Sequence, residues 1–210
     1  MSVGALATAV AWLAIAEASL MSADGPALRL RASGIGAGGS AAPLTIELLR
    51  WSTDAERAPL HAALLMPPPA PPASAAPVAG RGRGRGAATP PSPEARLTAT
   101  VKAAPTCGFI WGDGATGYSI KYAWRSSSTD GAERIVLVTD RRLGAHTPPW
   151  TQASGAAGEP DFTVIEMRLD SKGTGEGKTS LTTRVVVDTT ANTLALDGYT
   201  SAPIQLRVMR

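Results

Sequence analysis

The 210-residue sequence is poor in the residues that most often carry chemistry: it has one cysteine, Cys107, and two histidines, His61 and His146. A single thiol cannot form an intramolecular disulfide, and a cysteine-rich zinc site is excluded for the same reason. The H-E-x-x-H motif of metalloproteases and the G-x-S-x-G turn of serine hydrolases do not occur. We therefore expect no metal and no cofactor, and we interpret Cys107 as a small buried apolar residue.

The sequence also lacks an excess of charge on its folded part. Residues 67–93 contain Arg81, Arg83 and Arg85 and no acidic residue, so the rest of the chain has 17 basic and 17 acidic residues. Proteins that bind nucleic acid gain most of their non-specific affinity by neutralising phosphates with a basic patch. We do not expect nucleic acid as a partner, and we interpret the short Arg-Gly repeat as a solvated linker rather than an RNA-binding segment.

No apolar run is long enough to span a bilayer. Residues 3–16 carry no charge, but fourteen residues fall short of the roughly 20 that a membrane helix needs. This length is typical of the apolar core of a signal peptide, with small residues such as Ala16 and Ala18 at the cleavage site. The sequence predicts a signal peptide over residues 1–23, export to the periplasm or the cell exterior, and no integral membrane segment in the mature chain. The alternative is an alanine-rich helix packed on the domain through Trp12.

Residues 67–93 divide the rest of the sequence. This segment contains nine prolines and almost no residue that could be buried. Packing would therefore not offset the conformational entropy that the segment would lose on becoming ordered. The residues before it are too few to enclose a core alone. We predict a disordered Pro/Gly/Arg linker at 67–93, inserted into a single β-rich domain formed by residues 27–66 and 94–210.

Alternation of apolar and polar side chains is the main structural signal after residue 27, and it is typical of half-buried strands. Many short strands at regular spacing predict a mainly β fold, either an antiparallel β-barrel or a two-layer β-sandwich. One short α-helix is expected after Thr53, because Thr53 and Glu56 have the spacing of a capping box, although Pro59 should bend it or delay its start. About ten strands are expected, at residues 28–31, 44–48, 97–101, 109–111, 118–125, 135–138, 162–169, 181–187, 194–196 and 204–208.

Two glycine-rich segments resemble nucleotide-binding loops. Residues 173–179 resemble the end of a P-loop, and residues 34–39 match G-x-G-x-x-G. Each is followed by a strand-forming pattern, whereas both kinds of nucleotide site require a helix at that point. We interpret both segments as turns between strands.

The aromatic residues gather in one predicted strand. Tyr118, Tyr122 and Trp124 alternate with polar residues and should share a face with Ile120. Such a face is typical of a core, and it could also line the mouth of the barrel, near Trp111 and Trp150. In the second case the ligand would be a small apolar molecule or a carbohydrate.

The function predicted from these features is that of a non-catalytic exported binding or structural module. The alternative is a hydrolytic enzyme using surface carboxylates, for which a pair of acidic groups would be needed. The candidates are Glu133, Asp140, Glu166 and Asp170.

Three stretches, residues 50–57, 134–141 and 162–178, resemble segments of a family of short exported bacterial proteins that are rich in β-structure and have no established activity. The resemblance implies export and a shared β-rich fold. It implies no functional residue.

Overall fold

The computed structural model describes residues 26–34, 43–67, 91–112, 117–143 and 161–210. The predicted signal peptide, residues 68–90 of the predicted linker, and Trp12 and Trp150 lie outside this part of the chain. Within it, no helix is long and apolar enough to cross a membrane.

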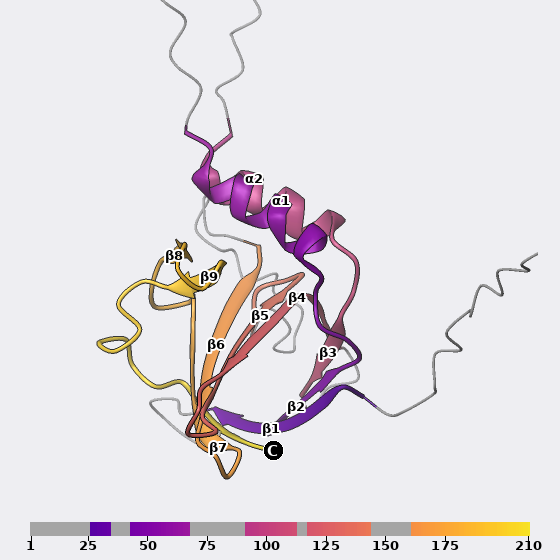
Figure 1. Ribbon diagram of the computed structural model, residues 1–210. Coiled ribbons are helices and arrows are strands. Elements are labelled where there is room, and N and C mark those ends of the chain that lie inside the picture. Colours follow the sequence, from indigo (N-terminus) through magenta and orange to yellow (C-terminus); the bar gives the residue numbers. More distant parts are fainter. Residues whose placement is uncertain (1–25, 35–42, 68–90, 113–116, 144–160) are drawn as a thin grey trace, which may run out of the picture.

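The protein is mainly β, and the barrel alternative is the correct one. Eight strands form a closed antiparallel barrel in the order β1-β10-β7-β6-β5-β4-β3-β2 (Figure 1). Along the chain each of these strands pairs with the next, and β10 pairs with β1 to close the ring. The strands are β1 (Leu28–Gly34), β2 (Pro43–Leu48), β3 (Gly108–Trp111), β4 (Tyr118–Ser127), β5 (Glu133–Thr139), β6 (Thr163–Leu169), β7 (Thr174–Thr179) and β10 (Leu206–Met209).

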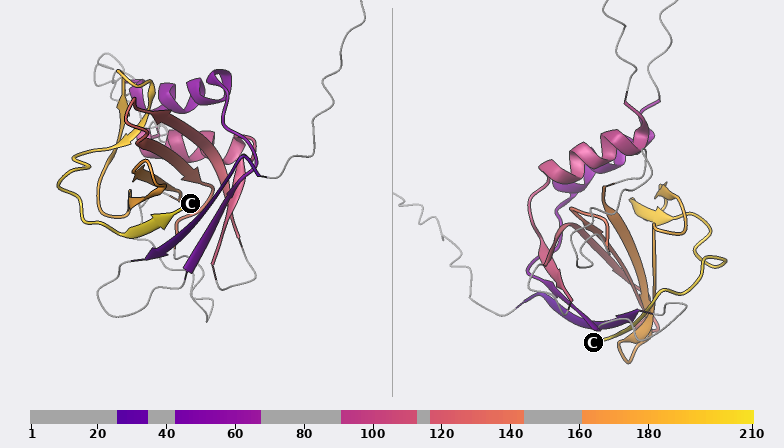
Figure 2. Two further views of the ribbon diagram at one scale, coloured as in Figure 1. Left: turned by 60° about the horizontal axis from the view of Figure 1, so that its bottom comes forward. Right: turned by 180° about the vertical axis from the view of Figure 1, so that it is seen from behind.

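Two insertions depart from this simple order. The helices α1 (Asp54–Leu65) and α2 (Pro93–Ala103) lie between β2 and β3, and a two-stranded ribbon of β8 (Val185–Asp188) and β9 (Thr193–Leu196) lies between β7 and β10. Figure 1 shows the helices side by side over one side of the barrel, with the ribbon next to them, and Figure 2 shows the same arrangement from behind.

The barrel interior is filled by apolar side chains. Leu28, Leu30 and Ala32 of β1 point inward and are buried, while Arg29 and Arg31 between them are exposed. An eight-stranded barrel is just wide enough for side chains to fill its interior. The other buried members of this core are Ile46, Leu48, Cys107, Ile110, Tyr118, Ile120, Ala123, Ile135, Leu137, Ile165, Met167, Leu169, Leu206 and Val208.

A second core lies outside the barrel, between the outer face of β4, β5 and β6 and the two insertions. Leu60 and Ala63 of α1 and Leu97 and Val101 of α2 pack there, and β9 contributes Leu194 among others. The barrel strands contribute alternate residues to it, because neighbouring positions on a strand point to opposite faces. These are Tyr122, Val136, Val138 and Val164, with Phe162 just before β6.

The predicted helix after Thr53 is confirmed, together with its capping box. It begins at Asp54 and continues through Pro59, so the proline does not delay its start. The predicted strand at residues 97–101 is wrong, because these residues belong to α2, a second helix. Ser92 caps it and Pro93 occupies its first turn, where a missing amide costs little. Pro93 therefore belongs to the helix rather than to the linker predicted at 67–93.

The predicted glycine-rich turn at residues 173–179 is also wrong in extent. The turn ends at Gly173, and residues 174–179 form β7, which pairs with both β6 and β10. The strand predicted at 181–187 shortens to β8. The described residues contain ten strands, the number predicted, because β7 was not predicted as a strand and the strand predicted at 97–101 is part of α2.

Gly175 explains why a barrel strand is glycine-rich. A Cβ atom at this position would lie 1.9 Å from the backbone oxygen of Arg168 on β6. We predict that Gly175→Ala lowers the free energy of unfolding in urea by roughly 1–3 kcal/mol or more, because β6 and β7 would have to separate. Gly112→Ala is the control, since its Cβ would meet only Leu44 Cδ2 at 3.5 Å. Equal effects of the two substitutions would contradict this account.

Candidate functional site

The aromatic residues predicted to share one face of β4 are divided between two faces. Ile120 lies opposite Thr139 and Tyr122 opposite Val138, so Lys121 is an extra residue that forms a β-bulge. A bulge reverses the inward and outward positions beyond it. Tyr118 and Ile120 therefore point into the barrel, whereas Tyr122 and Trp124 point outward beneath the insertions. The predicted single face is wrong for this reason.

Tyr122 is a fully buried anchor between three parts of the fold. None of its surface is exposed. Its hydroxyl lies 2.7 Å from Thr193 Oγ1 and 3.4 Å from His61 Nε2, and it accepts a hydrogen bond from the amide of Leu194 at 3.3 Å. One phenol thus ties β4 to β9 and to α1.

Tyr118 and Trp124 are also packed against the protein. Tyr118 is 8% exposed, with the Arg141 guanidinium 5.9 Å from its ring. Trp124 is half-buried, and the Arg134 guanidinium lies 5.8 Å from its ring. The geometry favours the core interpretation of all three aromatic residues, and ligand contact by Tyr118, Tyr122 or Trp124 stays a prediction.

Glu166 is the most enclosed of the four candidate carboxylates, with no exposed surface. Its Oε1 accepts from Arg134 Nε at 2.9 Å and from Arg168 Nη2 at 3.3 Å, while its Oε2 accepts from the amide of Leu196 at 3.0 Å. Arg134 also donates to Asp188 Oδ2 at 2.8 Å. These bonds hold the β8–β9 ribbon against β5 and β6.

The other three candidate carboxylates have separate structural partners. Glu133 accepts from Arg210 Nη2 at 2.6 Å, and Asp140 accepts from the amide of Ser119 at 3.0 Å. Asp170 accepts from the amide of Lys172 in the turn before β7 and from that of Thr174, the first residue of β7. Across the described ranges no cluster of three or more His, Cys, Asp or Glu side chains could hold a metal ion.

Lys178 and Tyr199 complete the polar contacts under the ribbon, and neither was predicted from the sequence. Lys178 Nζ donates to the carbonyl of Tyr199 at 2.6 Å and lies 4.5 Å from the centre of its ring. Arg168 approaches the same ring at 3.8 Å. Burial, and then the charge of Glu176, raise the pKa of Tyr199 to about 12, so the ring is a neutral platform for both cations.

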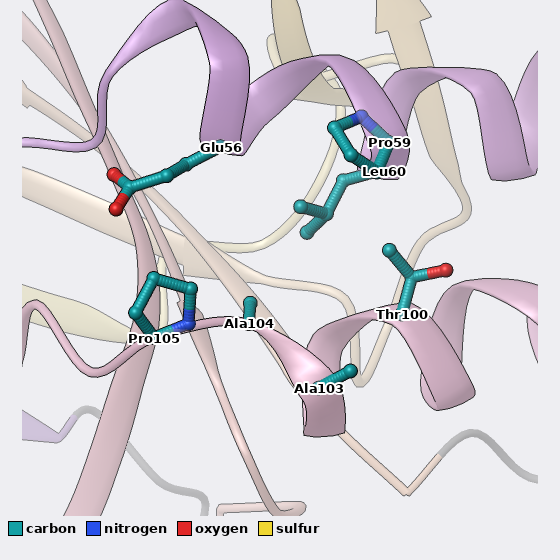
Figure 3. A pocket seen from close by; sticks show the side chains of 7 residues that line it. All are labelled: Glu56, Pro59, Leu60, Thr100, Ala103, Ala104 and Pro105. Carbon is teal, nitrogen blue, oxygen red and sulfur yellow. The ribbon is translucent and has the colours of Figure 1, made fainter.

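An open cleft of about 200 Å³ lies between the two helices. Figure 3 shows Glu56, Pro59 and Leu60 of α1 facing residues of α2 and of the segment that follows it. The residues on that second side are Thr100, Ala103, Ala104 and Pro105. All of these except Glu56 and Thr100 are apolar.

The polar groups at the cleft already have partners. The Glu56 carboxylate accepts from Arg50 Nη1 at 2.8 Å and from the amide of Thr53 at 2.9 Å, and these bonds lower its pKa. The Thr100 hydroxyl donates to the carbonyl of Arg96 at 2.9 Å. The cleft therefore offers an apolar surface bounded at one end by a neutralised ion pair.

Comparison of the chain with protein-family models, with curated proteins and with solved structures finds no match. The resemblance to short exported bacterial proteins gains no support from these comparisons.

We predict that Glu166→Ala lowers the free energy of unfolding by roughly 1–3 kcal/mol, because it leaves the buried amide of Leu196 without its partner and leaves the half-buried Arg134 with Asp188 alone. Glu47→Ala is the control, since Glu47 pairs with exposed Arg29 on the barrel surface and should contribute less than about 1 kcal/mol. Urea unfolding followed by circular dichroism measures both. A loss below about 1 kcal/mol for Glu166→Ala would show that the carboxylate does not hold the ribbon.

His61 predicts a pH dependence of stability. Burial, and then the charge of Arg57, lower the pKa of the imidazole below its usual value of 6.5. Below pH 6.5 the unfolded chain takes up the proton before the folded chain does, so the free energy of unfolding should fall from pH 7.5 to 5.5. His61→Gln should flatten this part of the urea-unfolding profile, while His146→Gln serves as the comparison. An unchanged slope in His61→Gln would contradict the assignment.

Proposed function

We propose that the protein is a non-catalytic exported binding module that holds a small apolar ligand in the cleft between α1 and α2. The proposal rests on one observation: side chains fill the interior of the barrel, whereas the cleft between the helices is open and apolar. Ligand sites are concave, mostly apolar and formed in advance, and this cleft has those properties.

The lining selects for an apolar ligand. Pro59, Leu60, Ala103 and Pro105 present hydrocarbon, and burial of apolar surface contributes roughly 25 cal/mol per Å². A charged ligand would lose its hydration without gaining a free partner, because the Glu56 carboxylate is already bound to Arg50. The volume of about 200 Å³ lies below the roughly 300–1,000 Å³ of sites for drug-sized molecules, so the ligand is small.

The two walls of the cleft are held at a fixed separation. Arg96 of α2 donates to the carbonyls of Ala63 and Met66, at the end of α1, at 3.2 and 2.6 Å. Leu60 and Leu97 are both buried in the second core beneath the helices. A preformed site binds without the cost of ordering its own walls.

The other parts of the proposal rest on the sequence. Export is supported by the uncharged stretch at residues 3–16, which has the length of a signal-peptide core. The hydrolase alternative finds no supporting geometry in the described residues, because each candidate carboxylate is engaged in a structural contact.

A neutral apolar dye, N-phenyl-1-naphthylamine, tests the site through its fluorescence on binding. We expect Ala103→Leu to fill the cleft and to weaken dye binding by about tenfold or more, while Ala58→Leu leaves it unchanged. Ala58 is an exposed position of α1 outside the cleft, so the two substitutions add the same side chain to a helix. Equal dye binding by both variants would refute the cleft as the ligand site.

A further inference from the structure

Strands β1, β2 and β10 lie on the side of the barrel away from the helices (Figures 1 and 2). Their outer face, together with that of β3, carries a distinct set of side chains. We call it the arginine face. Strand alternation places on it Phe109, Trp111, Thr45, Glu47, Arg29, Arg31, Ser33, Arg207 and Met209. Three of these residues are arginines and one is acidic, so the face is positively charged.

A row of side chains crosses the arginine face at right angles to the strands. Trp111 pairs with Thr45, Thr45 with Arg31, and Arg31 with Met209. Neighbouring strands are about 4.8 Å apart, so Trp111 and Arg31 lie two strands and about 10 Å apart. A ligand that contacts both must be longer than a single sugar ring.

Trp111 is exposed but held in place. Its side chain is 39% exposed, and its ring packs against that of Phe109 with the centroids 5.7 Å apart. A Cβ atom on Gly117 of the neighbouring chain segment would lie 2.7 Å from the indole. The indole can pack against Gly117 because Gly117 has no side chain. The exposed part of the ring therefore forms a flat platform with a fixed position.

Two arginines of the face are available to a ligand. Arg29 pairs with Glu47, whereas the side chains of Arg31 and Arg207 make no hydrogen bond or ion pair within the part of the chain that is described. Arg31 lies opposite Met209, and Arg207 is two residues from Met209, so the two arginines are diagonal neighbours about 7–8 Å apart. Their guanidinium groups can converge on one anion.

We propose that the arginine face binds an acidic polysaccharide, with the Trp111 indole stacked on a pyranose ring and with Arg31 and Arg207 paired to its carboxylates. A pyranose ring has a flat C–H face that suits an aromatic platform, and a guanidinium group matches a carboxylate with two parallel hydrogen bonds. The site is separate from the helical cleft and does not depend on the function proposed for it.

Other ligands fit this face less well. An extended peptide binds by adding to a free strand edge, and the strands of this face are paired on both sides in a closed barrel. A nucleic acid gains non-specific affinity from many phosphate contacts, and this face offers two unpaired arginines. A neutral polysaccharide would use the indole and leave both arginines unused.

Affinity electrophoresis of the full chain in native gels containing polygalacturonate tests the proposal, with dextran as the neutral polymer and poly(U) as the nucleic acid. Mobility in a polymer-free gel corrects for charge. We expect retardation by polygalacturonate alone, weakened about tenfold or more in Trp111→Ala and in the double variant Arg31→Ser/Arg207→Ser. Thermal melting by circular dichroism verifies that each variant is folded.

Matched controls lie elsewhere on the surface. Leu181→Ala removes an apolar side chain as exposed as Trp111, and Lys172→Ser/Arg184→Ser removes two exposed charges. Both should bind like the unchanged protein. Equal retardation by dextran, stronger retardation by poly(U), or unchanged binding in folded Trp111→Ala or in Arg31→Ser/Arg207→Ser would each overturn the proposal.

Discussion

The antiparallel pairing of β1 with β10 is the constraint on which the rest of the structure depends. It joins the first and last strands of the described chain and turns a sheet into a closed ring, so that no barrel strand has a free edge. Closure also fixes the interior, where side chains from seven of the eight strands form one packed core and the glycine-rich β7 contributes none of its members. Because that interior is occupied, the surfaces available to ligands lie outside the barrel.

The outside of the barrel is divided into two unlike halves. On β4, β5 and β6 most outward side chains are apolar or are buried polar groups, and the helices and the ribbon cover them, although Arg168 is exposed. Glu166 and Tyr122 supply directed contacts in this covered half, each bonding to the backbone of β9. On β3, β2, β1 and β10 the outward side chains are mostly polar or charged, and among the described residues neither the helices nor the ribbon covers them. One half of the surface thus stabilises the fold, and the other is free to recognise a ligand.

Most of the fold could be predicted from the sequence, because apolar and polar residues alternate along the strands and the apolar ones are those that point inward. The alternation fails at three places for physical reasons. Leu97, Ala99 and Val101 fit a strand, but Leu97 and Val101 are also four residues apart, and Ser92 and Pro93 start a helix there. Gly175 and Gly177 lack the side chains that would reveal β7.

The third failure is the bulge at Lys121, which separates the aromatic residues of the predicted site. One inserted residue moves Tyr122 and Trp124 to the opposite face from Tyr118, and nothing in local sequence marks it. The helical cleft was equally hidden, since it depends on how α1 and α2 pack. Trp111 was noted near the predicted mouth, but its platform depends on the cross-strand neighbour Gly117, which only the fold reveals.

Arg96 has a consequence for how the chain can be altered. Its guanidinium donates to the carbonyl of Met66 at 2.6 Å and to that of Pro91 at 2.9 Å, which lie on either side of residues 68–90. One side chain thus fixes both ends of the connection. Lengthening the connection should therefore lower the free energy of unfolding only slightly, because the entropic cost of closing a loop grows with the logarithm of its length. The joint between the helices is therefore a natural place for a circular permutation or a fused reporter domain, with the barrel itself left untouched.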